Sequence, residues 1–133
     1  MNYTNAEFRS ILYGHGFGYA PEPDPSFPVS SNNRPLTDKI TVDAIKEFQA
    51  YFQLKVDGIA GPKTMAKAEQ AMRVLQDNLN RVIKAGLPQN QPFYGPKTTA
   101  AVKDFERRYG YTVDGVANLE VRRRLNELAR QAA

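Results

Sequence analysis

The only histidine in the chain, His15, has the side chain best suited to metal binding or general-base chemistry. It lies between glycines in the segment YGHGFG, residues 13–18. A zinc enzyme needs several nitrogen or carboxylate ligands, and one loop histidine cannot supply them. We therefore predict that His15 is an ordinary surface residue, that the chain has no metal site, and that it uses no cofactor.

Acidic residues are the second type that could carry chemistry, because a pair of carboxylates can cleave a glycosidic bond. Two of them, Asp43 and Glu47, fall on the outward side of a helix that buries Ile45 and Phe48, where solvated charge is the usual state. The sequence also lacks a G-x-S-x-G motif and any serine with a candidate base. We predict no catalytic residues. The carboxylates considered are Asp38, Asp43, Glu47, Asp104 and Glu106.

The chain contains an internal repeat. The segment TVDAIKEFQAYFQLKVDGIAG (41–61) aligns without a gap with TTAAVKDFERRYGYTVDGVAN (98–118), at a constant offset of 57. Such agreement in a sequence of mixed composition indicates two copies of one structural unit, which we place at residues 1–72 and 73–133. The identical pairs are Thr41/Thr98, Ala44/Ala101, Lys46/Lys103, Phe48/Phe105, Val56/Val113, Asp57/Asp114, Gly58/Gly115 and Ala60/Ala117.

Apolar spacing predicts an all-α fold. Steps of three and four place Ile45, Phe48 and Phe52 on one helix face, and Val102, Phe105 and Tyr109 on another. The motif GPKT, at 61–64 and 95–98, opens a helix each time, since proline suits the first helical position. TNAE (4–7) predicts a capping box, with Gly14 ending that helix, and Val121, Leu125 and Leu128 lie on one face of a final helix.

The same spacing continues from Met65 to Val82, which predicts a long helix from Pro62 to about Ala85 that joins the two units. A short break near residues 73–76 is the alternative.

Each repeated helix leads into an Asp-Gly turn. Glycine supplies a positive φ, and the aspartate can bond to nearby backbone amides. Gly61 then lets the chain enter the next helix without a Cβ clash, and Asn118 replaces it in the second copy, where it tolerates left-handed geometry and can cap a helix. The structural turn residues are Asp57, Gly58, Gly61, Asp114, Gly115 and Asn118.

The first unit carries an insertion. Residues 16–36 are rich in proline and turn residues, which excludes a regular helix or a central strand. Phe17, Tyr19 and Phe27 would let this loop pack on the body. It is either an irregularity of the scaffold or a binding element.

Composition limits the class of protein. The 133 residues carry a net charge of +4, are 41% hydrophobic and include no cysteine, so the chain can form a core but no disulfide. The N-terminal residues lack the charged start and apolar run of a secretory signal, and no stretch is long enough to span a membrane. We expect a cytoplasmic protein without membrane insertion, or one in the cell wall or periplasm if it is exported by another route.

The string AIKEFQAYFQLKVDGIAGPKT (44–64) resembles the peptidoglycan-binding domain family, a three-helix type found beside bacterial cell-wall hydrolases. The segment LQDNLNRVIKAGL (75–87) resembles the first helix of that family. In the second copy Glu106, Asn118 and Val121 replace the usual Gln, Gly and Thr. The matching residues are Ala44, Ile45, Phe48, Gln49, Leu54, Asp57, Gly58, Gly61 and Thr64, then Ala101, Val102, Phe105, Gly110, Tyr111, Asp114 and Gly115.

The resemblance implies two three-helix units and non-catalytic binding of peptidoglycan, through a groove bordered by the second helix and the Asp-Gly turn of a unit. A cytoplasmic adaptor that binds a protein partner is the alternative. We do not expect a nucleic-acid reader, because Arg122, Arg123 and Arg124 are successive and point about 100° apart around their helix. The predicted ligand residues are Tyr51, Lys55, Arg107, Arg108 and Tyr111.

Overall fold

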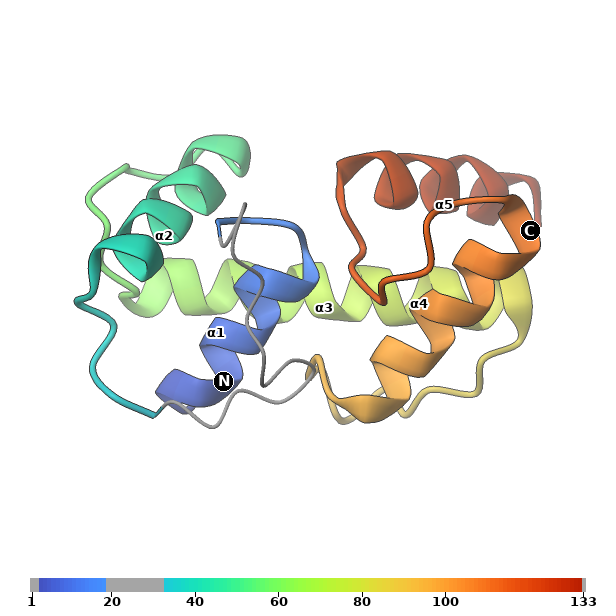
Figure 1. Cartoon of the computed structure of the whole chain (residues 1–133), viewed down its shortest axis with the longest axis horizontal. Coiled ribbons are helices and arrows are strands. Elements are labelled where there is room, and N and C mark those ends of the chain that lie inside the picture. Colours follow the sequence, from blue (N-terminus) through green and yellow to red (C-terminus); the bar gives the residue numbers. More distant parts are fainter. Residues whose placement is uncertain (1–2, 19–32, 133) are drawn as a thin grey trace.

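A computed structural model describes residues 3–18 and 33–132, and every regular element in those ranges is a helix. The long helix α3 runs the length of the molecule, with α1 and α2 at one end and α4 and α5 at the other (Figure 1). The predicted all-α fold is confirmed. The helices are α1 (Asn5–Gly14), α2 (Lys39–Tyr51), α3 (Pro62–Ile83), α4 (Pro96–Tyr109) and α5 (Leu119–Gln131).

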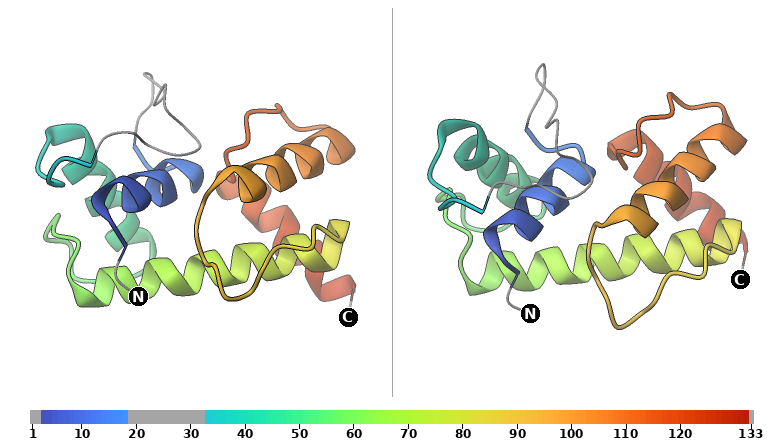
Figure 2. Two further views of the ribbon diagram at one scale, coloured as in Figure 1. Left: turned by 90° about the horizontal axis from the view of Figure 1, so that it is seen from below. Right: turned by 60° about the horizontal axis from the view of Figure 1, so that its bottom comes forward.

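Helix α3 is continuous through residues 73–76, so the alternative of a break there is wrong. It ends at Ile83, two residues before the predicted end, because Lys84 adopts a left-handed conformation with φ 57°. Figure 2 shows the unbroken helix from two further directions. We call α1, α2 and the first part of α3 the first unit, and the rest of α3 with α4 and α5 the second unit. The boundary between residues 72 and 73 stays a prediction.

The predicted helix starts are confirmed. Thr4 and Glu7 form a complete capping box at α1, which ends at Gly14. Pro62 and Pro96 occupy the first positions of α3 and α4. These signals are readable from sequence because they satisfy backbone groups within one turn of the helix end.

One hydrophobic cluster runs through both units. Phe48 of α2 and Phe105 of α4 are completely buried at equivalent places in it, as their spacing predicts. Tyr109 is an exception, because its side chain is 40% exposed. It lies in the last turn of α4, where one face of the ring stacks on Phe105, with centroids 4.7 Å apart, and the other faces solvent.

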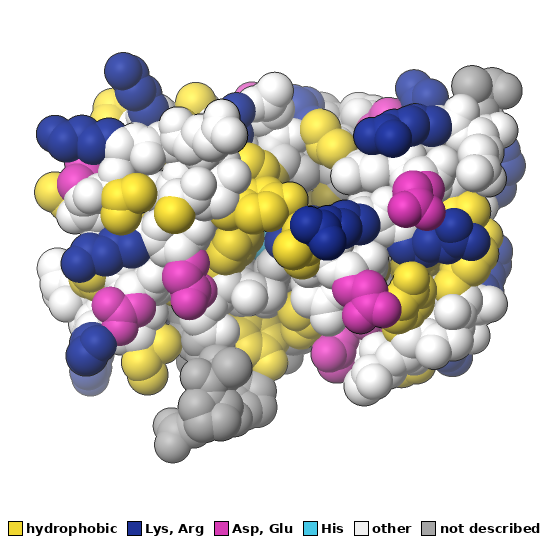
Figure 3. Space-filling model, turned by 90° about the horizontal axis from the view of Figure 1, so that it is seen from above, with side chains coloured by type: hydrophobic (Ala, Val, Ile, Leu, Met, Phe, Trp, Pro, Cys, Tyr) yellow, Lys and Arg dark blue, Asp and Glu magenta, His cyan; other side chains and the backbone are white. Residues whose placement is uncertain are grey.

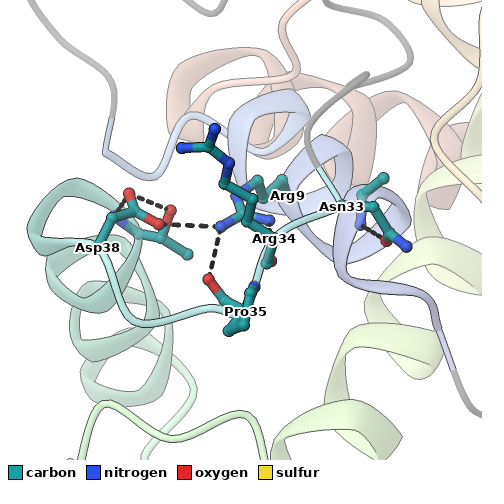
Figure 4. Close-up of polar contacts among 7 residues, drawn as sticks. Arg9, Asn33, Arg34, Pro35 and Asp38 are labelled. Carbon is teal, nitrogen blue, oxygen red and sulfur yellow. Dashed lines mark hydrogen bonds and ion pairs between the residues drawn. The ribbon is translucent and has the colours of Figure 1, made fainter.

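Buried Arg9 on α1 holds the chain that leads into α2 (Figure 4). Its guanidinium donates to the carbonyl oxygens of Arg34 (2.7 Å) and Pro35 (2.9 Å), and it pairs with Asp38 (2.9 Å). Asp38 in turn accepts from the backbone N–H of Thr41 and caps α2. Burial alone would raise the pKa of Asp38, but the hydrogen bonds from Arg9 and Thr41 lower it.

Gln76 has the equivalent role in the second unit, where it holds the chain that leads into α4. Its amide Nε2 donates to the carbonyl oxygen of Gln91 (2.9 Å), in the connection that leads to α4, and lies 3.3 Å from the hydroxyl of Thr98. Each unit therefore has a buried polar side chain on its first helix that fixes the start of its second helix. The predicted insertion loop lies mostly outside the described residues, as do Tyr19 and Phe27. Phe17 is described, and it packs on Phe48 with ring centroids 5.5 Å apart.

Candidate functional site

The first Asp-Gly turn is held by Gln49, which is 1% exposed beneath it. Its Oε1 accepts from the backbone N–H groups of Asp57 (3.1 Å) and Gly58 (2.9 Å). Its Nε2 donates to the Asp57 carboxylate (2.9 Å), the Ile59 carbonyl (3.0 Å) and the Thr64 hydroxyl (3.1 Å). Gly58 has φ 74°, the left-handed conformation that glycine permits. One amide thus fixes the whole turn.

Asp57 completes this turn through its carboxylate. Oδ1 accepts from the backbone N–H of Ile59 at 2.9 Å. That bond, followed by the bond from Gln49, lowers the pKa of Asp57. The aspartate therefore acts in the turn as an ionised acceptor.

The expected reason for Gly61 is wrong, because a Cβ there would meet nothing within 4 Å. Gly61 has φ −81° and begins α3 without a side-chain cap. Asn118 in the second unit has φ −66°, not left-handed geometry, and its side chain accepts from the N–H of Val121 at 3.0 Å. The two positions differ in capping, not in backbone strain.

The second turn is built around Glu106, also 1% exposed. Its Oε1 accepts from the N–H groups of Asp114 (3.1 Å) and Gly115 (2.8 Å). Gly115 has φ 75°, and the Asp114 carboxylate accepts from the N–H of Val116 at 2.9 Å. The two turns have the same hydrogen bonds to their backbone N–H groups, but the buried acceptor is the carboxyl group of Glu106 in the second turn and the amide of Gln49 in the first.

The second turn also joins the two units. The backbone N–H of Ala117 donates to the carbonyl of Gly14 in the first unit at 2.7 Å. Arg122 donates to the carbonyl of His15 at 3.1 Å. Tyr94 lies between the units and donates from its hydroxyl to the Gly115 carbonyl at 2.6 Å. The bonds from Ala117 and Arg122 cross between the units and fix how they sit against each other, whereas the Tyr94–Gly115 bond lies within the second unit. We call this region, where Gly14 and His15 meet Tyr94, Ala117 and Arg122, the joint.

The prediction that His15 lies on the surface is wrong, because its side chain is 2% exposed within this joint. Its Nδ1 is 2.8 Å from the Ile11 carbonyl, which can only accept, so the neutral ring donates. The edge of the ring meets Tyr94, with centroids 5.8 Å apart. Burial, and then the charge of Arg122, lower its pKa to about 4. His15 is thus a neutral packing residue of the joint.

A hollow of about 260 Å³ opens between α2, α3 and α5, directly beside the joint. We call it the inter-unit groove. Figure 3 looks onto this face and shows hydrophobic side chains gathered between the two units, with Lys and Arg side chains alongside. The groove is lined by His15, Tyr51, Phe52, Lys67, Gln70, Ala71, Val74, Leu75, Asn78, Arg122, Arg123, Leu125 and Asn126.

The charge of the groove has one sign. Lys67, Arg122 and Arg123 line it, and none of its lining residues is acidic. Arg122 lies over the ring of Tyr51, 5.0 Å from its centroid, and is already bonded within the joint. Arg123 is exposed and forms no ion pair with a described residue. The groove therefore combines an apolar floor with an available cation.

The predicted ligand residues do not gather in one place. Tyr51 lines the inter-unit groove and is 46% exposed. Tyr111 lines another hollow along α5, and Arg108 lines a third between α4 and the end of α3. Lys55 and Arg107 are exposed and line none of the described hollows.

Sequence reasoning missed the remaining polar lining of the groove, on α3 and α5. Asn78 of α3 donates to Asn126 of α5 at 2.7 Å across the groove, which links positions 48 residues apart. Such a contact leaves no local pattern.

The acidic residues considered for catalysis are engaged separately. Asp43 pairs with Lys39 on α2, and Asp104 pairs with Arg108 on α4. Glu47 accepts from the backbone N–H of Gly18 at 2.9 Å. Over residues 3–18 and 33–132, no three His, Asp or Glu side chains are grouped as a metal site would require. Across the same ranges, no helix has the length and apolar character needed to cross a membrane.

The sequence profile of the family described as "Putative peptidoglycan binding domain" matches residues 15–67 and again residues 68–125. The chain belongs to this family. The two matches meet within α3, so this peptidoglycan-binding family protein contains two tandem family regions that share a helix. No curated protein matches the chain, and no solved structure does.

Proposed function

We propose that this protein binds peptidoglycan without cleaving it, and that the inter-unit groove holds the polymer. Two family regions cover most of the chain, and the groove is the hollow that both of them build. The observation that carries the proposal is the lining of the groove, which has three cations and no carboxylate. Peptidoglycan offers the complementary groups, because its stem peptides bear free carboxylates.

The lining fits a chain of sugars and peptides. The half-exposed ring of Tyr51 at the rim offers an apolar face to a sugar. Gln70, Asn78 and Asn126 supply amides that can bond to N-acetyl groups and peptide bonds. The volume of the groove, about 260 Å³, lies just below the roughly 300–1,000 Å³ of small-molecule pockets. The groove would therefore hold only a short segment of the polymer.

A binding role without catalysis agrees with the state of the acidic residues. Asp38 is committed to capping α2 and to Arg9. Glu106 lies buried beneath its turn. Neither faces the groove, and a glycosidase needs two carboxyl groups on either side of the bond it cleaves.

The adaptor alternative loses part of its support. One of its motives, the arginine-rich last helix, is weakened, because Arg122 is bonded within the joint and Arg124 pairs with Glu127. Another motive, the insertion at residues 16–36, lies mostly outside the described residues and stays open. Binding to the wall requires access to it, so we propose that the protein reaches the cell wall or periplasm. Fractionation of cells tests this location, and recovery in the cytoplasmic fraction alone would contradict it.

The experiment for function is sedimentation with purified insoluble peptidoglycan at low salt. We expect the protein in the pellet and no release of soluble sugar or peptide fragments into the supernatant. Protein that stays in the supernatant at low salt would overturn the binding proposal. Release of fragments would overturn its non-catalytic part.

A further inference from the structure

The two Asp-Gly turns differ in one chemical group. Gln49 and Glu106 are 57 residues apart, equally buried, and each accepts two turn N–H groups through Oε1. The remaining atom of Gln49 is an NH₂ group, whereas that of Glu106 is a second carboxyl oxygen. An NH₂ group always donates, but a carboxyl oxygen donates only when it is protonated.

In the first turn, each group bonded to this atom accepts a hydrogen bond from it. Nε2 of Gln49 donates to the Asp57 carboxylate, to a backbone carbonyl and to the Thr64 hydroxyl. The counterpart of Asp57 is Asp114, while Val121 stands in place of Thr64, so the hydroxyl is lost. An ionised Glu106 would set a second carboxylate against Asp114, with no proton between them. Two carboxylates that share a site cannot both ionise without cost.

We propose that Glu106 and Asp114 form a proton-dependent lock, in which a proton shared between them closes the second turn and its loss loosens that turn. The first turn has no such dependence, because an amide does not titrate. The inference concerns this chain's second unit and does not depend on the proposed function.

The electrostatic surroundings favour the protonated state. Burial is the largest cause that raises the pKa of Glu106, to about 7, and the hydrogen bond and charge of Asp114 add to it. Tyr94, from the connection before α4, has its own pKa raised, first by burial and partly by Glu106. Two further charged side chains reach the turn from the neighbouring helices, and both are cations. The Lys103 side chain of α4 lies across Gly115, and Arg122 of α5 bonds to the Ala117 carbonyl. Val121 of α5 is uncharged.

The sign of the pH effect follows from this direction. The folded-state pKa of Glu106 lies above its ordinary value of 4.5. Its contribution to stability is therefore complete below pH 4.5 and is lost as the pH rises through about 7. Loosening of the turn would reach the joint, because Gly115 accepts from Tyr94 and Ala117 donates to Gly14.

The experiment measures urea unfolding at pH 5 and pH 8.5 for the wild type, Glu106→Gln and Gln49→Glu. Comparing variants at the same pH cancels the other titrating groups. Between these pH values we expect the unfolding constant of the wild type to rise on the order of 10- to 100-fold relative to Glu106→Gln, since each pKa unit is a factor of ten. Gln49→Glu should add a second dependence of the same sign. Equal pH dependence in wild type and Glu106→Gln would overturn the proposal.

A second measurement on the unmodified protein covers the case in which a variant does not fold. The side-chain carboxyl ¹³C resonance of Glu106, followed by NMR, should titrate with a midpoint near 7. A midpoint near 4.5, with the turn amides unchanged across the titration, would equally overturn the lock.

Discussion

The ring of Tyr94 lies against Gly14 so closely that a Cβ atom on Gly14 would stand 2.5 Å from two of its ring carbons. Gly14 ends α1 in the first unit, and Tyr94 precedes α4 in the second. Both are buried, so neither can move aside into solvent. The contact thereby packs the two small helical units against each other, next to His15, which lines the inter-unit groove.

Gly14→Ala should destabilise the protein by about 1–3 kcal/mol, the usual cost of overfilling a packed core. The backbone at Gly14 is helical, so the loss would come from the Tyr94 ring and not from φ. Urea unfolding measures it. The matched control is Gly61→Ser, where a Cβ meets nothing within 4 Å and serine suits the N-cap. Equal losses in both variants would contradict the role of this contact.

Arg9→Met should cost about 2–3 kcal/mol, because two carbonyl oxygens and the Asp38 carboxylate would lose a charged donor. Methionine keeps most of the length and apolar character of the side chain. Lys39→Met is the control, since it removes an exposed pair with Asp43 that should matter little. Chemical denaturation compares the two, and a change in Arg9→Met no larger than in Lys39→Met would refute the predicted role of Arg9.

The single histidine gives a direct test of the joint. Burial and then Arg122 lower the pKa of His15 to about 4, from an ordinary 6.5. Its contribution to stability is therefore complete above pH 6.5 and is lost as the pH falls through about 4, opposite in sign to that of Glu106. The imidazole proton resonance should titrate near 4. A midpoint near 6.5 would show that the ring is exposed.

Much of the fold could be read from the sequence because it depends on local signals. The capping box at Thr4, the proline at each GPKT and the repeat of Phe48 at Phe105 each act within one helix or one turn. Apolar spacing after Pro62 predicts the long helix, with a short break near residues 73–76 as the alternative. These features predict the element order and the all-α class of fold, and the family resemblance adds the division into two three-helix units.

The site was harder to predict, because it depends on contacts between distant segments. Nothing near His15 indicates that Tyr94 covers it, and nothing near Asn78 indicates Asn126. The change from Gln49 to Glu106 was visible as a departure from the family pattern. Its consequence required the buried geometry of the turn, where one proton decides whether the group can donate.

The central claim, that the inter-unit groove binds peptidoglycan, is tested most directly by sedimentation of a matched pair of variants. Arg123→Glu reverses a groove cation that forms no ion pair with a described residue, whereas Arg107→Glu makes the same change of charge on an exposed site that lines no described hollow. With purified insoluble peptidoglycan at low salt, we predict that wild type and Arg107→Glu sediment, while Arg123→Glu loses at least 10-fold in affinity, about 1.4 kcal/mol. Equal sedimentation of all three, or loss confined to Arg107→Glu, would contradict the account.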